Sequence, residues 1–226
     1  MYGEYARSLA PKLLVSFGLL TALGFLGWIL FGGGWSVFPA SWGLTGPGAG
    51  AGRAVLFALG LLYLAKVSAT LDLILVRKMD WAEAATIAVW VNLIYLVYGL
   101  AGAGPHAARG FVPFLGAGLF IAGAALNLAS EWQRRRWKAR PENKGRLYRE
   151  GLFRRAVHIN YFGENLSFVG FSLAAGPWWA FLIPALMAVL FIAANIPMLD
   201  AYLAKRYGDD FRDYAAQTPK FIPFLY

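Results

Sequence analysis

Three polar residues recur every four positions where one apolar segment ends. Asn127, Glu131 and Arg135 would share one face of a helix that leads from lipid depth into a basic loop. A polar face at that depth is costly to expose to lipid, so it should point into the protein. Arginine also holds phosphate through two parallel hydrogen bonds. The face therefore predicts one wall of a site for a large anionic cofactor.

The stretch GLFRRAVHINYFGEN at residues 151–165 supplies a second polar set, at the start of a later apolar segment. Its members lie at steps of three or four residues: His158, Asn160, Tyr161 and Glu164. Such steps gather side chains on one helical surface. A tyrosine face can also stack on a base. The two polar sets, joined by an arginine-rich loop, predict a cofactor pocket.

The loop that joins the two sets, within residues 132–158, carries ten Lys or Arg residues from Arg134 to Arg155, against the glutamates Glu142 and Glu150. A second interpretation of this loop stays open. A polybasic segment beside a membrane also enforces topology and attracts anionic headgroups, at roughly 1 kcal/mol per basic residue. Both interpretations place the loop at a membrane surface.

The composition is that of an integral membrane protein. Of 226 residues, 59% are hydrophobic and only 15% are charged, which is too little polar surface for a soluble domain. The absence of cysteine excludes disulfides, thiolate nucleophiles and Cys-ligated metals, and two histidines leave little for a metal site. We therefore expect no metal, and chemistry that comes from an organic cofactor or a lipid partner.

Six stretches approach the length of about 20 apolar residues that a membrane helix needs. Glycine and proline punctuate the connections, and the shortest connection, Gly176-Pro177, predicts a tight helical hairpin. The sequence therefore predicts an all-α integral membrane protein with about six transmembrane helices. The stretches are Leu13–Phe31, Ala54–Val76, Ala82–Leu100, Phe111–Ala129, Ile159–Ala175 and Trp178–Met198.

Basic residues predict the orientation, because Lys and Arg are retained on the cytoplasmic side of a membrane. If the N- and C-termini are both cytoplasmic, that side holds all of the 21 basic residues except Arg53, Lys66 and Arg109. The basic loop then faces the cytoplasm. In a bacterium the membrane would be the cytoplasmic (inner) one.

The segment after the last span is expected to continue as an amphipathic helix at the cytoplasmic interface, with Tyr202 near its start. Its aromatic end, FIPFLY, is expected to lie back on the membrane surface. A simple interfacial anchor is the alternative role for this segment.

From about Gly116 to Tyr226 the chain resembles a membrane superfamily that joins steroid 5-alpha-reductases and sterol C=C reductases to isoprenylcysteine and phospholipid methyltransferases. The shared pattern is a polar-ended helix, a basic loop, a helix start of the form His-x-x-Tyr-x-Gly, a tight hairpin and an aromatic tail. The matching residues are His158, Tyr161, Gly163, Leu203, Tyr207, Gly208, Phe211 and Pro223. The resemblance implies a membrane-embedded enzyme.

The branches of this superfamily differ inside the motif. Methyltransferases usually read Arg-His-Pro-x-Tyr-x-Gly, whereas residues 157–164 here read VHINYFGE, which is similar to the reductases. The resemblance implies NADPH as the cofactor, with S-adenosylmethionine as the alternative. By the same resemblance, the dinucleotide-binding positions fall on Asn127, Glu131, Arg146, Asn160, Glu164 and Tyr202, and Arg135 would meet the phosphates.

The N-terminal spans depart from the reductase pattern. They contain no Gln-Glu pair, and the tyrosine that polarises the substrate ketone in steroid reductases falls on Lys66. A lysine inside a span is by default functional or paired, so Lys66 is a candidate proton donor, with a structural pairing as the alternative. Tyr98 is a further catalytic candidate, with packing as its alternative role.

These expectations combine into one function. The chain would be an NADPH-dependent reductase of an activated C=C bond in a steroid or other unsaturated lipid that slides in from the bilayer. Residues 1–110 would form the substrate-side half and residues 111–226 the cofactor-binding half. The alternatives are an S-adenosylmethionine-dependent lipid or isoprenoid methyltransferase and a non-catalytic lipid-binding protein. Nucleic acid is not expected as a partner, and the sequence leaves the substrate and the oligomeric state open.

Overall fold

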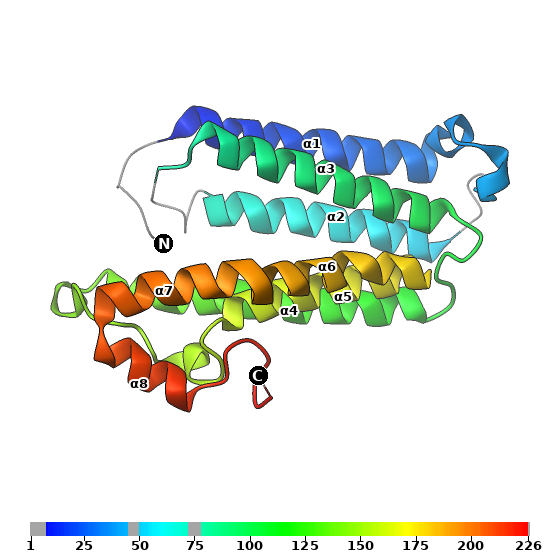
Figure 1. Cartoon of the computed structure of the whole chain (residues 1–226). Helices are drawn as coiled ribbons and strands as arrows, with labels where there is room; N and C mark the ends of the chain where they lie inside the picture. Colours follow the sequence, from blue (N-terminus) through cyan, green and yellow to red (C-terminus); the bar gives the residue numbers. More distant parts are fainter. Residues whose placement is uncertain (1–7, 45–49, 72–77, 226) are drawn as a thin grey trace. The chain divides into compact units, whose positions relative to one another are not determined.

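The computed structural model describes residues 8–44, 50–71 and 78–225, and the regular elements within these ranges are all helical (Figure 1). The α-helices are α1 (Leu9–Phe31), α2 (Ala51–Ala69), α3 (Trp81–Ala103), α4 (Val112–Lys138), α5 (Ile159–Ala175), α6 (Leu182–Leu190), α7 (Ile196–Tyr207) and α8 (Asp209–Gln217). A π-helical segment, Phe191–Asn195, joins α6 to α7. Short 3-10 helices lie at Gly34–Val37, Ala40–Trp42, Pro141–Asn143, Gly151–Arg154 and Trp178–Phe181. The prediction of an all-helical fold is confirmed.

Within the described residues, five helical segments are long and apolar enough to cross a membrane, which makes the chain an integral multi-pass membrane protein. They are α1, α2, α3, α4 and the continuous run Trp178–Tyr207. The remaining predicted span is helix α5, which has the predicted bounds but only 17 residues. The predicted second span runs on to Val76, and its end at residues 72–77 lies outside the described ranges.

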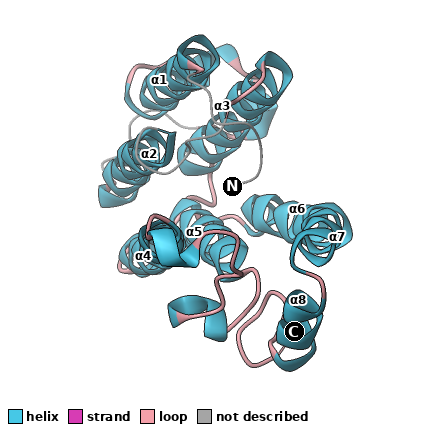
Figure 2. Ribbon diagram, turned by 90° about the vertical axis from the view of Figure 1, so that its left-hand side faces the viewer, coloured by secondary structure: helices cyan, strands magenta, loops and turns pink. Residues whose placement is uncertain are grey.

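The chain divides into two compact units, whose helices are seen in a second view in Figure 2. The first comprises Met1–Phe120 and Val169–Ile183, and the second comprises Ile121–Phe168 and Pro184–Tyr226. Helices α4 and α5 therefore contribute to both units. The predicted substrate-side half, residues 1–110, falls within the first unit, and its functional role stays a prediction.

Helix α4 is longer than the apolar stretch that predicted it. It continues past Ala129 to Lys138, because the Glu, Gln, Arg and Lys residues of this extension are good helix formers. Its last turn holds Arg135, Arg136 and Lys138, whose charges complement the negative end of the helix dipole. The predicted polar face thus lies on one continuous helix that extends beyond the apolar segment.

In the second unit α4 and α5 touch backbone to backbone. A Cβ added at Gly123 would lie 2.4 Å from the backbone nitrogen of Ser167, and one added at Gly163 would lie 2.7 Å from that of Asn127. Small residues at such contacts let membrane helices approach closely. The contact fixes the start of α5 against the polar end of α4.

Gly123→Ala is expected to lower the free energy of unfolding by roughly 1–3 kcal/mol, because its methyl group meets backbone atoms that cannot move aside. Gly118→Ala on the same helix is the matched control, since nothing lies within 4 Å of the added Cβ and alanine favours a helix by about 0.5–1 kcal/mol. Thermal unfolding in one detergent should shift down for the first variant and not for the second. Equal shifts would contradict the packing.

The C-terminal tail folds back onto the start of α5. The backbone N–H groups of Val157 and His158 donate to the carbonyl oxygens of Pro219 and Lys220, both at 2.8 Å. Phe221 is only 2% exposed. The predicted amphipathic helix is divided between the end of α7, which holds Tyr202, and α8. The placement of FIPFLY on the membrane surface stays a prediction, except that Phe221 is buried within the unit. The physical reason is that N–H groups at a helix start need acceptors, which the tail supplies.

Candidate functional site

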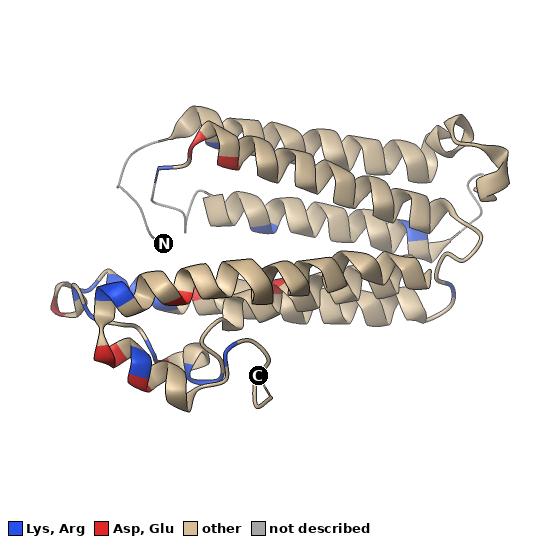
Figure 3. Cartoon of the chain, in the orientation of Figure 1, with Lys and Arg blue, Asp and Glu red and all other residues tan. Residues whose placement is uncertain are grey.

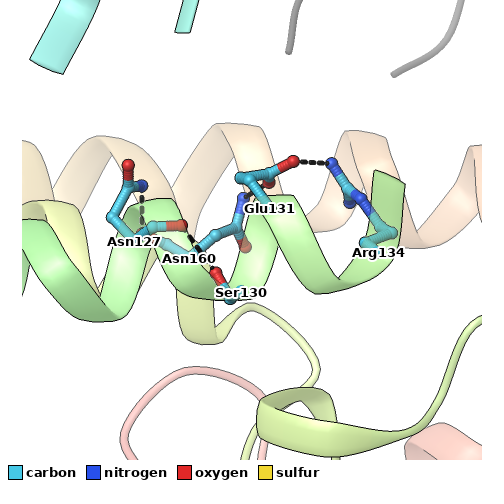
Figure 4. A network of polar contacts seen from close by, with 5 residues as sticks. All are labelled: Asn127, Ser130, Glu131, Arg134 and Asn160. Atoms are coloured by element: carbon cyan, nitrogen blue, oxygen red, sulfur yellow. Dashed lines mark hydrogen bonds and ion pairs between the residues drawn. The ribbon is translucent and has the colours of Figure 1, made fainter. Parts of the chain in front are cut away.

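A buried polar network joins α4 to the start of α5 in the second unit (Figure 4). The side-chain nitrogen of Asn127 donates to the backbone oxygen of Asn160 at 2.8 Å, and the side-chain nitrogen of Asn160 donates to Oε1 of Glu131 at 2.8 Å. Glu131 and Asn160 are 6% and 9% exposed. The structure thus brings together three residues that the sequence predicted for one site.

Two partners hold the Glu131 carboxylate. Its Oε2 pairs with the guanidinium of Arg134, one turn further along α4. Taking a carboxylate out of water costs several kcal/mol, which paired charges and hydrogen bonds must offset. The sequence prediction chose Arg135 from its spacing of four and missed Arg134, although a spacing of three also places side chains together on a helix. Arg135 is half-buried.

Three other predicted cofactor residues make contacts of their own. Arg146 is exposed, and its backbone oxygen accepts a hydrogen bond from Lys138 Nζ at 2.6 Å. The Tyr202 hydroxyl accepts from Arg206 Nη1 at 2.8 Å. Glu164 is half-buried and lies four residues after Asn160 on α5. Their role in binding a cofactor stays a prediction.

His158 is fully buried and pairs with α7. Its Nε2 lies 2.8 Å from Asp200 Oδ1, and Lys220 Nζ lies 3.5 Å from the other carboxylate oxygen. The imidazole stacks on Tyr161, which in turn stacks on Phe191 with ring centroids 4.7 Å apart. His158 therefore connects the start of α5 to α7 through Asp200, and to the tail through its backbone bond to Lys220. The sequence prediction did not pair it with Asp200, because 42 residues separate the two.

The basic loop has a hydrophobic core of its own. Tyr148, Phe153, Ala156 and Ile159 form a buried cluster, and partly buried side chains from α4 pack against it. In Figure 3 the ribbon positions of Lys and Arg, in blue, gather along the loop after α4 and where α7 meets α8. A depression of about 640 Å³ lies between this loop and the C-terminal part of α8, lined by Arg149, Glu150, Gly151, Arg154, Asp213, Tyr214, Gln217 and Thr218. The buried cluster therefore holds the backbone of the basic loop in place, while its arginine side chains remain at the surface.

Tyr214 links this loop to α8 and predicts a pH dependence. Its hydroxyl donates to the Phe153 carbonyl oxygen at 2.5 Å, and burial, followed by the nearby Tyr148, raises its pKa above the ordinary 10.0. Above that value an unfolded tyrosine loses its proton while the folded one keeps it, so stability falls as the pH rises. Thermal unfolding should therefore shift downward between about pH 9 and pH 11.

The matched variant is Tyr214→Phe, which should cost about 1 kcal/mol at neutral pH through the lost hydrogen bond and should show a smaller alkaline shift. Thermal unfolding in a non-ionic detergent, measured at each pH, checks both effects. An unchanged alkaline shift in the variant would contradict the assignment.

Helix α5 also contains a buried acceptor without a partner. Among the described residues, no hydrogen-bond donor reaches the Oδ1 atom of Asn165. Asn165 lies four residues after Tyr161 on α5, so it shares the helix face that stacks on the π-helical segment Phe191–Asn195. Single π-helical turns occur frequently at functional sites. The sequence prediction missed Asn165, because its lack of a partner is visible only in the fold.

The two catalytic candidates belong to the first unit. Lys66 is 6% exposed in the last turn of α2, and its Nζ lies 5.2 Å from the centroid of the Tyr63 ring. Tyr98 is fully buried, with its hydroxyl 3.0 Å from Ser172 Oγ and its ring stacked on Phe171. A buried lysine and a buried phenol are the kinds of group that donate a proton in a dry site. Their catalytic roles stay predictions.

These features define a class of protein: a helical, multi-pass membrane protein with a buried Asn-Glu-Arg network beside a basic loop. The family model described as "Protein of unknown function (DUF1295)" matches residues 74–218, and the chain belongs to this family. The matched range contains Tyr98 and all the predicted cofactor residues. Lys66 precedes it.

Curated relatives match about half of the chain. The chain is 30% identical over 108 residues to 3-oxo-5-alpha-steroid 4-dehydrogenase 2 of Rattus norvegicus and 29% identical over 112 residues to that of Homo sapiens. It is also 31% identical over 112 residues to a probable O-methyltransferase, ustE, of Ustilaginoidea virens. These matches cover 48%, 50% and 49% of the chain but only 41%, 42% and 37% of the relatives. The predicted resemblance to both branches is confirmed as a distant and partial one.

Proposed function

We propose that this protein is a membrane-embedded, NADPH-dependent reductase of an activated C=C bond in a steroid or other unsaturated lipid. The observation that carries the proposal is the buried network of Asn127, Asn160 and Glu131. These are three of the positions to which the reductase resemblance assigned the dinucleotide. Asn160 lies 29 residues after Glu131 in the sequence, yet its side chain bonds to that carboxylate. The partial identity to two steroid dehydrogenases supports the same activity.

The residues present suit a nicotinamide dinucleotide. The loop and the end of α4 offer exposed arginines for its phosphates, and arginine recognises phosphate through paired hydrogen bonds. The unpartnered Oδ1 of Asn165 is an acceptor for an amide N–H, which the nicotinamide carboxamide would supply. Glu131, Asn160 and Asn165 would hold the cofactor, together with Arg135 and Arg146 at its phosphates.

NADPH, when bound, supplies a hydride to the β-carbon of the activated double bond. The chain's own residues bind and orient the reactants and keep water out. Lys66, or Tyr98 in its place, holds the proton that completes the reduction at the neighbouring carbon. In this proposal the chain crosses the membrane six times, with both termini and the basic loop cytoplasmic, and the lipid substrate enters laterally from the bilayer.

The test is thermal stabilisation of the detergent-purified protein by NADPH, NADH and S-adenosylmethionine. A ligand that binds only the folded state stabilises it by about 2.7 kcal/mol at a hundredfold excess over its Kd. NADPH should raise the unfolding temperature most, because the loop arginines can also reach its extra phosphate. If neither NADPH nor NADH stabilised the protein, the proposal would be wrong.

A methyltransferase is the second candidate, and one observation favours it. The match to a probable O-methyltransferase, 31% identity over 112 residues, is close to the match to the rat dehydrogenase, 30% over 108 residues. Stabilisation by S-adenosylmethionine alone would select a lipid or isoprenoid methyltransferase in place of the reductase.

A further inference from the structure

A pocket of about 310 Å³ lies in the first unit, where α2 begins and α3 ends. The start of α2, the end of α3, residues 107–109 and the end of α5 line it. Two of the lining residues are arginines, Arg53 and Arg109, and none of those described is acidic. The chain segments 32–53 and 102–111 contain no Asp or Glu in the sequence either. The pocket is therefore a concentration of positive charge.

Backbone carbonyl groups at the ends of two helices bind the buried side chain of Arg53. Its side chain is 8% exposed, its Nε donates to the carbonyl oxygen of Gly102 and its Nη1 to that of Leu30, at 3.3 and 3.2 Å. These carbonyls lie in the last turns of α3 and α1, where helices leave carbonyl groups unsatisfied and their dipoles are negative. Since none of the described lining residues carries a negative charge, the pocket has an affinity for an anion.

Glycine brings the pocket walls close together. A Cβ added at Gly52 would lie 2.9 Å from the Ala108 carbonyl oxygen, and one added at Gly102 would lie 2.4 Å from Leu56 Cδ1. A larger residue at Gly52 would force the start of α2 away from residues 107–109, because the near atom belongs to the backbone. Arg109, in contrast to Arg53, is exposed, so it is free to reach a ligand from outside. One buried and one exposed arginine thus frame the same pocket.

Tryptophans place this end of the unit at a membrane surface. Trp28 lies in the last turn of α1, and the nearby connections carry Trp42 and Trp178, which are 52% and 77% exposed. Tryptophan is enriched at the level of the lipid headgroups. Because α1, α2 and α3 are membrane-spanning helices, their ends at this pocket lie where lipid phosphates lie.

We propose that this pocket binds a phosphate group, presented by the headgroup of an anionic phospholipid or as a free ion. Arginine pairs with phosphate through parallel hydrogen bonds, and the pocket volume leaves room for the glycerol of a headgroup beside it. The proposal is independent of the reductase activity. In the predicted orientation the pocket opens on the side opposite the basic loop.

Native mass spectrometry of the full-length protein tests the site with three probes: dioctanoyl phosphatidylglycerol, dioctanoylglycerol and inorganic phosphate. Arg109→Gln should weaken phosphatidylglycerol binding about tenfold or more through the loss of charge-assisted hydrogen bonds. Arg212→Gln, which removes an exposed charge from α8, is the matched control and should change binding much less. Ala107→Leu, which narrows the pocket, should weaken binding like Arg109→Gln.

Each outcome decides the question. Binding of phosphatidylglycerol and not dioctanoylglycerol, lost in Arg109→Gln, supports a lipid headgroup as the ligand. Arg109-dependent binding of inorganic phosphate alone supports the site with a free ion as its ligand. Equal losses in Arg109→Gln and Arg212→Gln, equal binding of the uncharged lipid, or no binding of any probe would overturn the proposal.

Discussion

Lys66→Met should lower turnover by on the order of 10²–10⁴-fold while leaving NADPH affinity unchanged, because a lost proton donor slows only the chemical step. Lys66 is 6% exposed on α2 and precedes the range that matches the family model. Methionine keeps its length and apolar stem, so packing is largely kept. Turnover would be measured as transfer of deuterium from labelled NADPH to membrane lipids, and affinity by thermal stabilisation.

Two controls make the Lys66 result specific. Lys66→Arg keeps the positive charge but holds its proton too tightly to donate it, so it should be as inactive as the methionine variant. Tyr98→Phe removes the alternative donor, whose hydroxyl is bonded to Ser172. If Lys66→Met kept full turnover and Tyr98→Phe lost it, the proton donor would be Tyr98 and not Lys66.

Asn160→Ala should weaken NADPH binding by roughly 10–100-fold. The substitution removes the donor to Glu131 Oε1 and leaves a buried carboxylate oxygen without that partner, so the network that we propose as part of the cofactor site loses its geometry. The measurement is the NADPH concentration that gives half of the maximal thermal stabilisation. The backbone oxygen of residue 160, which accepts from Asn127, is kept in the alanine variant. The variant therefore tests the contribution of the Asn160 side chain alone.

Asn92→Ala is the matched control for this loss. Asn92 belongs to the first unit, and its carboxamide donates to the carbonyl oxygens of Gly18 and Ala88. This variant loses a comparable side chain, so it should unfold at a lower temperature but bind NADPH with its original affinity. If both variants bound NADPH equally well, the network would not be part of the cofactor site.

The helices and the polar sets could be predicted from the sequence because their signals are local. The bounds of α5 agree with the prediction, since a run of apolar residues ends at Gly176-Pro177 and its start carries a polar motif. Asn127 and Glu131 are four residues apart, so their shared face on α4 could also be predicted from the local sequence. Their convergence with Asn160 was predicted only as two surfaces that share a pocket, without the bonds that the structure shows.

The remaining features depend on contacts between distant segments. The pairing of His158 with Asp200 joins residues 42 positions apart, and the return of Phe221 to the start of α5 depends on where the tail finds backbone donors. The buried Oδ1 atom of Asn165 has no hydrogen-bond donor among the described residues, which is visible only in the fold. No periodicity encodes such pairings, so sequence reasoning did not find them.

Isotope transfer tests the central claim most directly. The purified protein would be incubated with lipids extracted from its host membrane and with NADPH deuterated at C4 of the nicotinamide, and the lipids would be analysed by mass spectrometry. We predict a reduced lipid about one mass unit heavier than the product formed with unlabelled NADPH, absent in Lys66→Met. Lipids that gain no deuterium from NADPH but gain a labelled methyl group from S-adenosylmethionine would contradict the account.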